Sequence, residues 1–188
     1  MIPQPSPEPY RAEWMEKVAR RTRPLEAYAL GGPQIGVAPE GSFRTQWEFH
    51  YRDGAVWVER EGVDPVKLFD RAGITQISAC FDQQCQPFVG FTAEDKAYFW
   101  MLHPTTGARE FREIPNARTP FCQLDDKRSM TRADADVILS FGRGDKIIAL
   151  VQRELYNVEH VMGTTLGRIT ALAPTVGYRL AWRIKETT

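Results

Sequence analysis

Bulky and polar side chains alternate along residues 43–51, which is the pattern of a strand with one buried face. The pair Asp53-Gly54 follows, and then a second run of β-forming residues, 55–60. A strand, an Asp-Gly pair and another strand together are the strongest short signal for a β-hairpin. We therefore predict an antiparallel hairpin over residues 43–60.

The same pattern returns twice along the chain. The second predicted hairpin has its turn at residues 93–96, and the third has its turn at residues 142–145. The strands predicted around these turns are residues 87–91, 97–102, 136–141 and 146–152. Further candidate strands flank the three hairpins at residues 66–69, 77–82, 110–114, 119–125 and 158–162. The turns thus recur about every 40 to 50 residues, with about four short strands in each unit.

A repeat of this length with four strands is typical of propeller blades, although an antiparallel meander that folds as a sandwich gives a similar spacing. Three units are fewer than the four to eight blades of an ordinary closed propeller. The sequence therefore predicts a mainly β fold of antiparallel hairpin repeats, either blade-like or a sandwich, in which any closure involves other chains. Residues 168–185 end in alternating large side chains, and we predict a closing strand there.

The first 41 residues have a different composition. Residues 1–9 carry four prolines, and residues 24–41 carry four glycines and three prolines, so we predict an extended start and an irregular connector. Between them, Tyr10, Trp14 and Val18 share one face of a predicted short amphipathic helix. A helix this short needs a partner for its apolar face.

These features divide the chain into an N-terminal arm, residues 1–41, and a β domain, residues 42–188. The arm is predicted to dock onto another subunit through the face that its predicted helix presents.

Three aromatic residues in a row, Tyr98, Phe99 and Trp100, occupy one predicted strand. Successive strand residues point to opposite faces, so this run indicates a strand buried on both faces. The second face would meet another sheet or another subunit. The alternative is that aromatic side chains, Trp57 and Trp100 among them, are exposed and stack against sugar rings.

Charge and composition exclude several classes of protein. The 24 basic and 24 acidic residues balance, so the chain lacks the basic excess of a nucleic-acid or membrane surface. Its 43% hydrophobic content is that of a globular protein. We expect no signal peptide, because residues 1–9 show no basic segment followed by an apolar run, and no membrane span, because the sequence has no stretch of about 18 apolar residues.

The three cysteines, Cys80, Cys85 and Cys122, do not form a disulfide framework, and they favour synthesis in a reducing cytoplasm. The expected state of Cys80 and Cys85 is a pair of buried thiols. A labile disulfide between them is the alternative, because the two residues flank a predicted turn.

No motif in the chain predicts catalysis. His50, His103 and His160 share no local spacing typical of metal ligands, and the acids near residues 125–136 lack the glycine and glutamate of a calcium loop. Nucleophile elbows, phosphate loops and dinucleotide fingerprints are missing from the sequence. We therefore predict no catalytic residue, no metal and no cofactor. A glycan hydrolase would need two carboxylates in a cleft, and its candidates are Asp82, Glu94, Asp95 and Asp125.

Three stretches, residues 46–54, 73–83 and 121–128, resemble a family of small virion proteins encoded among the tail genes of tailed phages that infect Gram-negative bacteria. The likeness covers about residues 14–185, and the proline-rich start lies outside it. The resemblance implies a structural role in the virion tail, near its tip, baseplate or fibre attachment, and no catalytic residues.

The expected partners are other tail proteins, further copies of this chain in a ring or trimer, and tail fibres, with no nucleic acid and no membrane. The expected location is the virion tail, after synthesis in the host cytoplasm. A carbohydrate- or host-receptor-binding module of the tail is the alternative.

Overall fold

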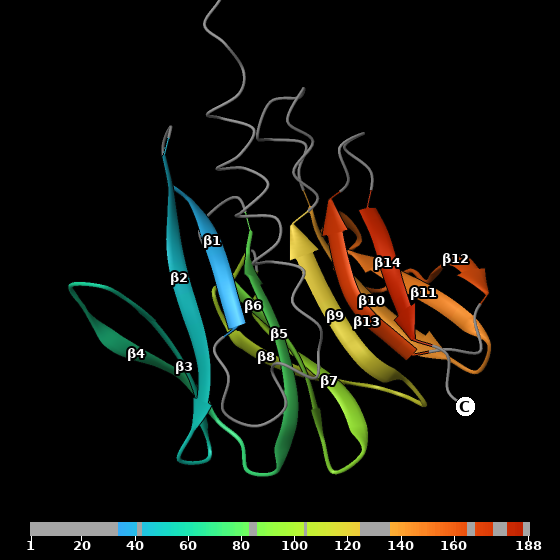
Figure 1. Ribbon diagram of the computed structural model, residues 1–188, viewed down its shortest axis with the longest axis horizontal. Coiled ribbons are helices and arrows are strands. Elements are labelled where there is room, and N and C mark those ends of the chain that lie inside the picture. Colours follow the sequence, from blue (N-terminus) through green and yellow to red (C-terminus); the bar gives the residue numbers. More distant parts are fainter. Residues whose placement is uncertain are drawn as a thin grey trace, which may run out of the picture.

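The computed structural model describes seven segments of the chain: residues 34–40, 43–82, 86–103, 105–124, 136–164, 168–174 and 180–185 (Figure 1). The predicted helix with Tyr10, Trp14 and Val18 lies outside these residues. Side chains are described between residues 47 and 164 of the same segments.

Nearly all of the described residues lie in antiparallel sheets, which confirms the predicted mainly β fold (Figure 1). The first sheet contains β1 (Gln34–Glu40), β2 (Phe43–Arg52), β3 (Ala55–Arg60) and β4 (Val63–Asp70). The second contains β5 (Ile74–Phe81), β6 (Pro87–Ala93), β7 (Lys96–Leu102) and β8 (Arg109–Ile114). The third contains β9 (Arg118–Leu124), β10 (Val137–Arg143), β11 (Lys146–Val151) and β12 (His160–Thr164). A 3-10 turn, η3 (Gln152–Glu154), follows β11, and β13 (Arg168–Pro174) and β14 (Leu180–Lys185) form a two-stranded sheet.

All three predicted hairpins are present, each with a two-residue turn. Such turns need residues with positive φ, and each of these turns contains at least one. Asp53 and Gly54 have φ values of 53° and 72°, and Glu94 and Asp95 have values of 53° and 60°. Positive φ at both central residues matches the right-handed twist of the strands. In the third turn Gly144, with a φ of 60°, supplies the left-handed residue.

Two predictions near the ends of the β region are wrong in detail. Residues 34–40, expected to be part of an irregular connector, form β1 and pair with β2 along their whole length. Their proline, Pro39, is tolerated because β1 is an edge strand of its sheet. In the range 168–185, expected to hold one closing strand, the described residues form two paired antiparallel strands, β13 and β14.

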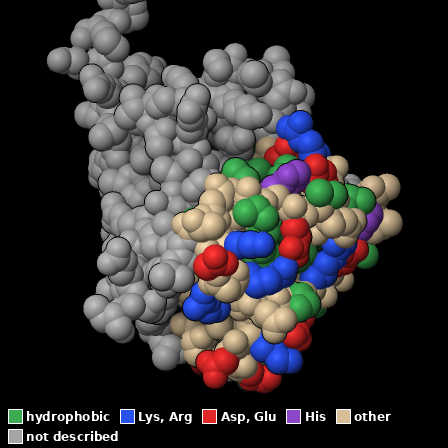
Figure 2. Space-filling model, turned by 90° about the vertical axis from the view of Figure 1, so that its right-hand side faces the viewer, with side chains coloured by type: hydrophobic (Ala, Val, Ile, Leu, Met, Phe, Trp, Pro, Cys, Tyr) green, Lys and Arg blue, Asp and Glu red, His purple; other side chains and the backbone are tan. Residues whose placement is uncertain are grey.

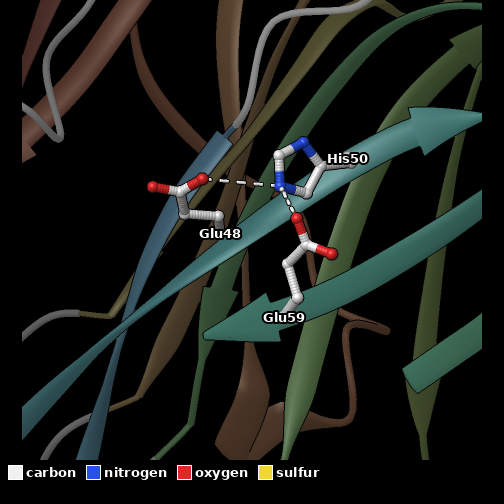
Figure 3. Close-up of side chains that lie close together, drawn as sticks. All are labelled: Glu48, His50 and Glu59. Atoms are coloured by element: carbon white, nitrogen blue, oxygen red, sulfur yellow. Dashed lines mark ion pairs between the residues drawn. The ribbon is translucent and has the colours of Figure 1, made fainter. Parts of the chain in front are cut away.

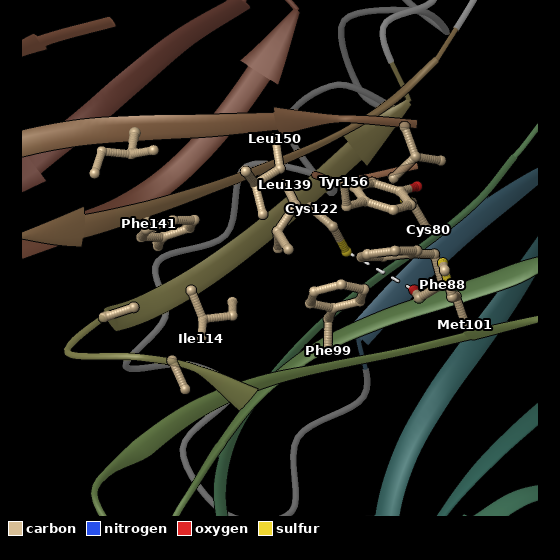
Figure 4. Packing of buried hydrophobic residues seen from close by; sticks show 14 of the residues in the cluster. Cys80, Phe88, Phe99, Met101, Ile114, Cys122, Leu139, Phe141, Leu150 and Tyr156 are labelled. Atoms are coloured by element: carbon tan, nitrogen blue, oxygen red, sulfur yellow. Dashed lines mark hydrogen bonds between the residues drawn. The ribbon is translucent and has the colours of Figure 1, made fainter. Parts of the chain in front are cut away.

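The second sheet is buried on both faces, as the aromatic run in β7 predicts. Trp100 belongs to an apolar cluster between the first and second sheets, whereas Phe99 belongs to a cluster between the second and third sheets. The cluster between the second and third sheets includes Phe88, Leu139 and Tyr156, whose side chains pack together in Figure 4. Since only 1% of Trp100 is exposed, the prediction of Trp100 as an exposed aromatic contact is wrong.

The sheets meet along their first strands. β5 packs against both β1 and β9, and β9 packs against β13, although these strands lie far apart in the sequence (Figure 1). The outer strands of the three four-stranded sheets are β4, β8 and β12. At Gly90 in β6 the second and third sheets approach so closely that a Cβ atom would lie 3.3 Å from Leu139 Cδ1, which explains the glycine.

A buried polar contact fixes β5 against β9. The Cys122 N–H donates to Ser78 Oγ at 3.0 Å, and the Cys122 thiol donates to the Ser78 carbonyl at 2.9 Å. The thiol also lies 3.8 Å from the Phe88 carbonyl (Figure 4). Cys80 is buried, as expected, and Cys85 lies outside the described residues.

Candidate functional site

The outer face of the first sheet carries polar and aromatic side chains that the core does not use. In β2, Phe49 faces the core, so Glu48 and His50 point to the opposite face. In β3, Val56 and Val58 face the core, so Trp57 and Glu59 point outward. The hairpin register places Glu48 opposite Glu59 and His50 opposite Trp57.

Glu48, His50 and Glu59 form the polar centre of this face (Figure 3). His50 Nε2 lies 2.8 Å from Glu59 Oε1 and 3.5 Å from Glu48 Oε2. The Nε2 atom is buried and makes no hydrogen bond of good geometry, although it is close to both carboxylates. The three ligating atoms all lie within 4.8 Å of one another. We refer to these three residues as the Glu-His-Glu cluster.

Trp57, predicted as an exposed aromatic contact, lies beside this cluster and is half-buried. The Arg52 guanidinium lies 5.1 Å from the centre of its ring, and Arg52 Nη2 lies 3.4 Å from Glu59 Oε2. Arg52 therefore covers part of the Trp57 ring face and offsets part of the negative charge of Glu59. A sugar ring stacking on Trp57 would have to share this ring with Arg52.

An open groove of about 550 Å³ lies next to the cluster, lined by Glu48, Glu59, Arg60, Glu61 and Val63. Three carboxylates against one guanidinium make its lining negative. Of the lining residues, Glu48 and Glu59 belong to the Glu-His-Glu cluster, so solvent has direct access to it.

Of the carboxylates considered for a hydrolase, Asp82 lies apart from Glu94 and Asp95, which share one turn. Asp82 is buried, and its two oxygens accept hydrogen bonds from the Gln86 N–H at 2.8 Å and from Gln152 Nε2 at 2.9 Å. Because β5 pairs with β6 from Ile74 and Ala93 to Phe81 and Pro87, Asp82 lies at the opposite end of this hairpin from Glu94. Asp125 lies outside the described residues.

The cavity beside Asp82 is too small for a substrate. Its volume is about 10 Å³, which is about enough for one water molecule. Gln152 Oε1 accepts the Val137 N–H at 3.1 Å, so the Asp82–Gln152 contact ties the second sheet to the third. Burial raises the pKa of Tyr156, which lines this cavity, well above its usual value and keeps its hydroxyl protonated near neutral pH.

The three histidines belong to three different sheets or their loops. His103 Nδ1 accepts the N–H groups of Thr105 and Thr106 at 3.2 and 3.3 Å, and His160 Nε2 lies 2.6 Å from Glu154 Oε2. Among the described residues, only His50 joins a group of three possible metal ligands.

Local spacing alone missed the Glu-His-Glu cluster because its members come from two strands. The Asp53-Gly54 turn could have revealed it, since a two-residue turn pairs Arg52 with Ala55 and therefore Glu48 with Glu59.

Comparisons with known proteins identify no relative of this chain. No protein-family model matches the sequence, and no curated protein or solved structure matches it. Among the residues that the structure describes, no helix is long and apolar enough to cross a membrane.

Proposed function

We propose that this chain is a non-enzymatic structural subunit of the tail of a tailed phage that infects Gram-negative bacteria. It acts at the tail tip, baseplate or fibre attachment by assembling with other tail proteins, with fibres and with further copies of itself. The observation that carries the proposal is the apolar surface at the outer strand β12, where Val161 is 60% exposed and Met162 is 50% exposed.

The β12 strand has the features of a surface awaiting a protein partner. It is the last strand of the third sheet among the described residues, so its outer edge presents unpaired backbone groups. Val158, in the connection before it, is also exposed. On this side of the molecule hydrophobic side chains lie among charged ones (Figure 2), a mixture that is common in protein interfaces.

The connection that leads into β12 is held in place by one ion pair and by hydrogen bonds from Arg112. Arg143 binds both oxygens of Glu159 at 2.8 and 2.7 Å. Arg112 reaches across from β8 and donates to the Leu155 carbonyl at 2.9 Å and to Asn157 Oδ1 at 3.2 Å. A surface that is already ordered loses less conformational entropy on binding, which favours assembly.

The arrangement of the sheets supports a blade-like fold completed by neighbours. The three four-stranded sheets meet along their first strands, β1, β5 and β9. β13 packs against β9 in the same way, so it is the first strand of a fourth unit, of which two strands are described. We propose that these sheets are propeller-type blades and that strands from another subunit complete the set. The balanced net charge allows copies of the chain to approach without strong repulsion.

A carbohydrate- or receptor-binding module is the second candidate. It is favoured by Trp57, which lies on the outer face of the first sheet beside the acidic groove. If this candidate is correct, Trp57→Ala abolishes binding to host polysaccharide and leaves assembly unchanged.

The assembly proposal is tested by placing charge on β12. The double variant Val161→Glu, Met162→Glu is expected to fold, because both side chains are exposed, and to be lost from purified particles. The control is Lys96→Gln, a charge change at the exposed first residue of β7, which is expected to enter particles normally. Normal incorporation of the double variant, measured by quantitative mass spectrometry, would contradict a docking role for β12.

A further inference from the structure

We propose that Glu48, His50 and Glu59 bind one divalent transition-metal ion of the zinc class on the outer face of the first sheet. This site departs from the expectation of no metal, which rested on local sequence spacing. It does not depend on the proposed tail function, because it rests on the geometry of one hairpin.

The donor set suits such an ion. One imidazole nitrogen and two carboxylate oxygens are ligands that zinc accepts, and imidazole favours transition metals over calcium or magnesium. Three protein ligands leave at least one coordination position for water. The groove beside the cluster leaves room for that water and gives the ion a path from solvent.

The distances between the donor atoms are close to those in a metal site. Two ligands that each lie ~2.1 Å from one ion are ~3.0 to 3.4 Å apart, depending on whether the geometry is octahedral or tetrahedral. His50 Nε2 lies 2.8 Å from Glu59 Oε1 and 3.5 Å from Glu48 Oε2. Small side-chain rotations therefore bring all three atoms around one ion.

The imidazole supplies a second observation, independent of the acids. Its Nε2 atom is buried, has no aligned hydrogen-bond partner and points between the two carboxylates (Figure 3). Without a metal, the contacts of this nitrogen are with the two carboxylates, at 2.8 Å from Glu59 and 3.5 Å from Glu48, and a metal ion placed between them would bind all three groups at once. The neutral ring with a free Nε2 lone pair is the form that binds metal.

The charge balance also favours a cation. Glu48 and Glu59 lie directly opposite each other on neighbouring strands, and like charges in this position are destabilising. Glu61 adds a third carboxylate to the groove. Arg52 Nη2 lies 3.4 Å from Glu59 Oε2 and offsets part of the charge of that carboxylate, whereas Glu48 is the more exposed of the two acids.

The test is a titration of the full chain after chelator treatment. Zn²⁺ is expected to bind with a stoichiometry of one in isothermal titration calorimetry, and Co²⁺ to give visible absorption bands of a site with a nitrogen ligand. His50→Gln and Glu59→Gln are each expected to weaken Zn²⁺ binding at least about tenfold, which corresponds to about 1.4 kcal/mol. The matched controls are His103→Gln and His160→Gln, which alter the other two histidine–carboxylate contacts and are expected to keep full affinity.

Circular dichroism of each variant confirms that it is folded. If Glu59→Gln loses structure, Glu48→Gln replaces it, because Glu48 is the more exposed of the two acids. Absence of Zn²⁺ binding overturns the proposal and leaves the cluster as an ion-pair network. Equal loss of affinity in the control variants, or full affinity in His50→Gln, overturns it as well.

Discussion

Replacing Trp100 with alanine is expected to lower the free energy of unfolding by about 3–5 kcal/mol. Trp100 is 1% exposed and lies between the first two sheets, with its ring 5.2 Å from that of Phe69. Its indole Nε1 has no hydrogen-bond partner, so the loss comes from apolar contacts and from the cavity left behind. A loss of this size is a large part of the total stability of an ordinary domain, which is about 5–15 kcal/mol.

Denaturant unfolding of the purified protein measures this loss. Trp57→Ala is the matched control, because it removes the same side chain from the half-buried outer face of the neighbouring sheet and is expected to cost about 1 kcal/mol. Equal losses for the two variants would show that the cluster between the first and second sheets does not hold them together as described.

Deleting residues 1–23 is expected to leave the β domain folded and to abolish its incorporation into particles. The described strands begin at Gln34, and the described members of both apolar clusters lie between Trp47 and Tyr156, so the deletion removes none of the contacts that the structure describes. The predicted helix, in contrast, offers Tyr10, Trp14 and Val18 to a neighbouring subunit.

Two point variants refine the deletion experiment. Trp14→Ala is expected to weaken the binding free energy of the docking contact by on the order of 3 kcal/mol, as for a large-to-small change in a core. Glu16→Ala, on the opposite side of the predicted helix, is the control and is expected to have little effect. The idea of a docking arm is wrong if the truncated protein enters particles at normal occupancy, or if the isolated domain melts at a markedly lower temperature after truncation.

The strands and their hairpins could be predicted because their signals are local. Alternation along residues 43–51 and the Asp53-Gly54 pair fix a strand, a turn and a register within twenty residues. The run from Tyr98 to Trp100 likewise indicated a strand buried on both faces, and the structure confirms this. The strand β1 was missed because its glycine and proline resemble those of a connector, whereas an edge strand tolerates both.

Contacts between distant parts of the chain could not be predicted in this way. Trp100 and Trp57 have the same chemistry and lie in similar strands, and only the stacking of whole sheets decides that one is buried and the other half-exposed. Ser78 and Cys122 are separated by 44 residues, and no local pattern indicates that β5 and β9 bring them together. The Glu-His-Glu cluster lies between these two cases. Its residues are not neighbours in the sequence, but the register of one hairpin is enough to bring them together.

The proposal that this chain is an assembled part of a virion tail is tested most directly by locating it in the particle. Cryo-electron microscopy of purified virions, together with quantification of tail proteins by mass spectrometry, gives its position and copy number. We expect the three stacked sheets in density at the tail tip, baseplate or fibre attachment, in several copies around the tail axis and with β12 against a neighbouring subunit. Particles that are complete and infectious but contain no peptide of this chain would contradict the proposal.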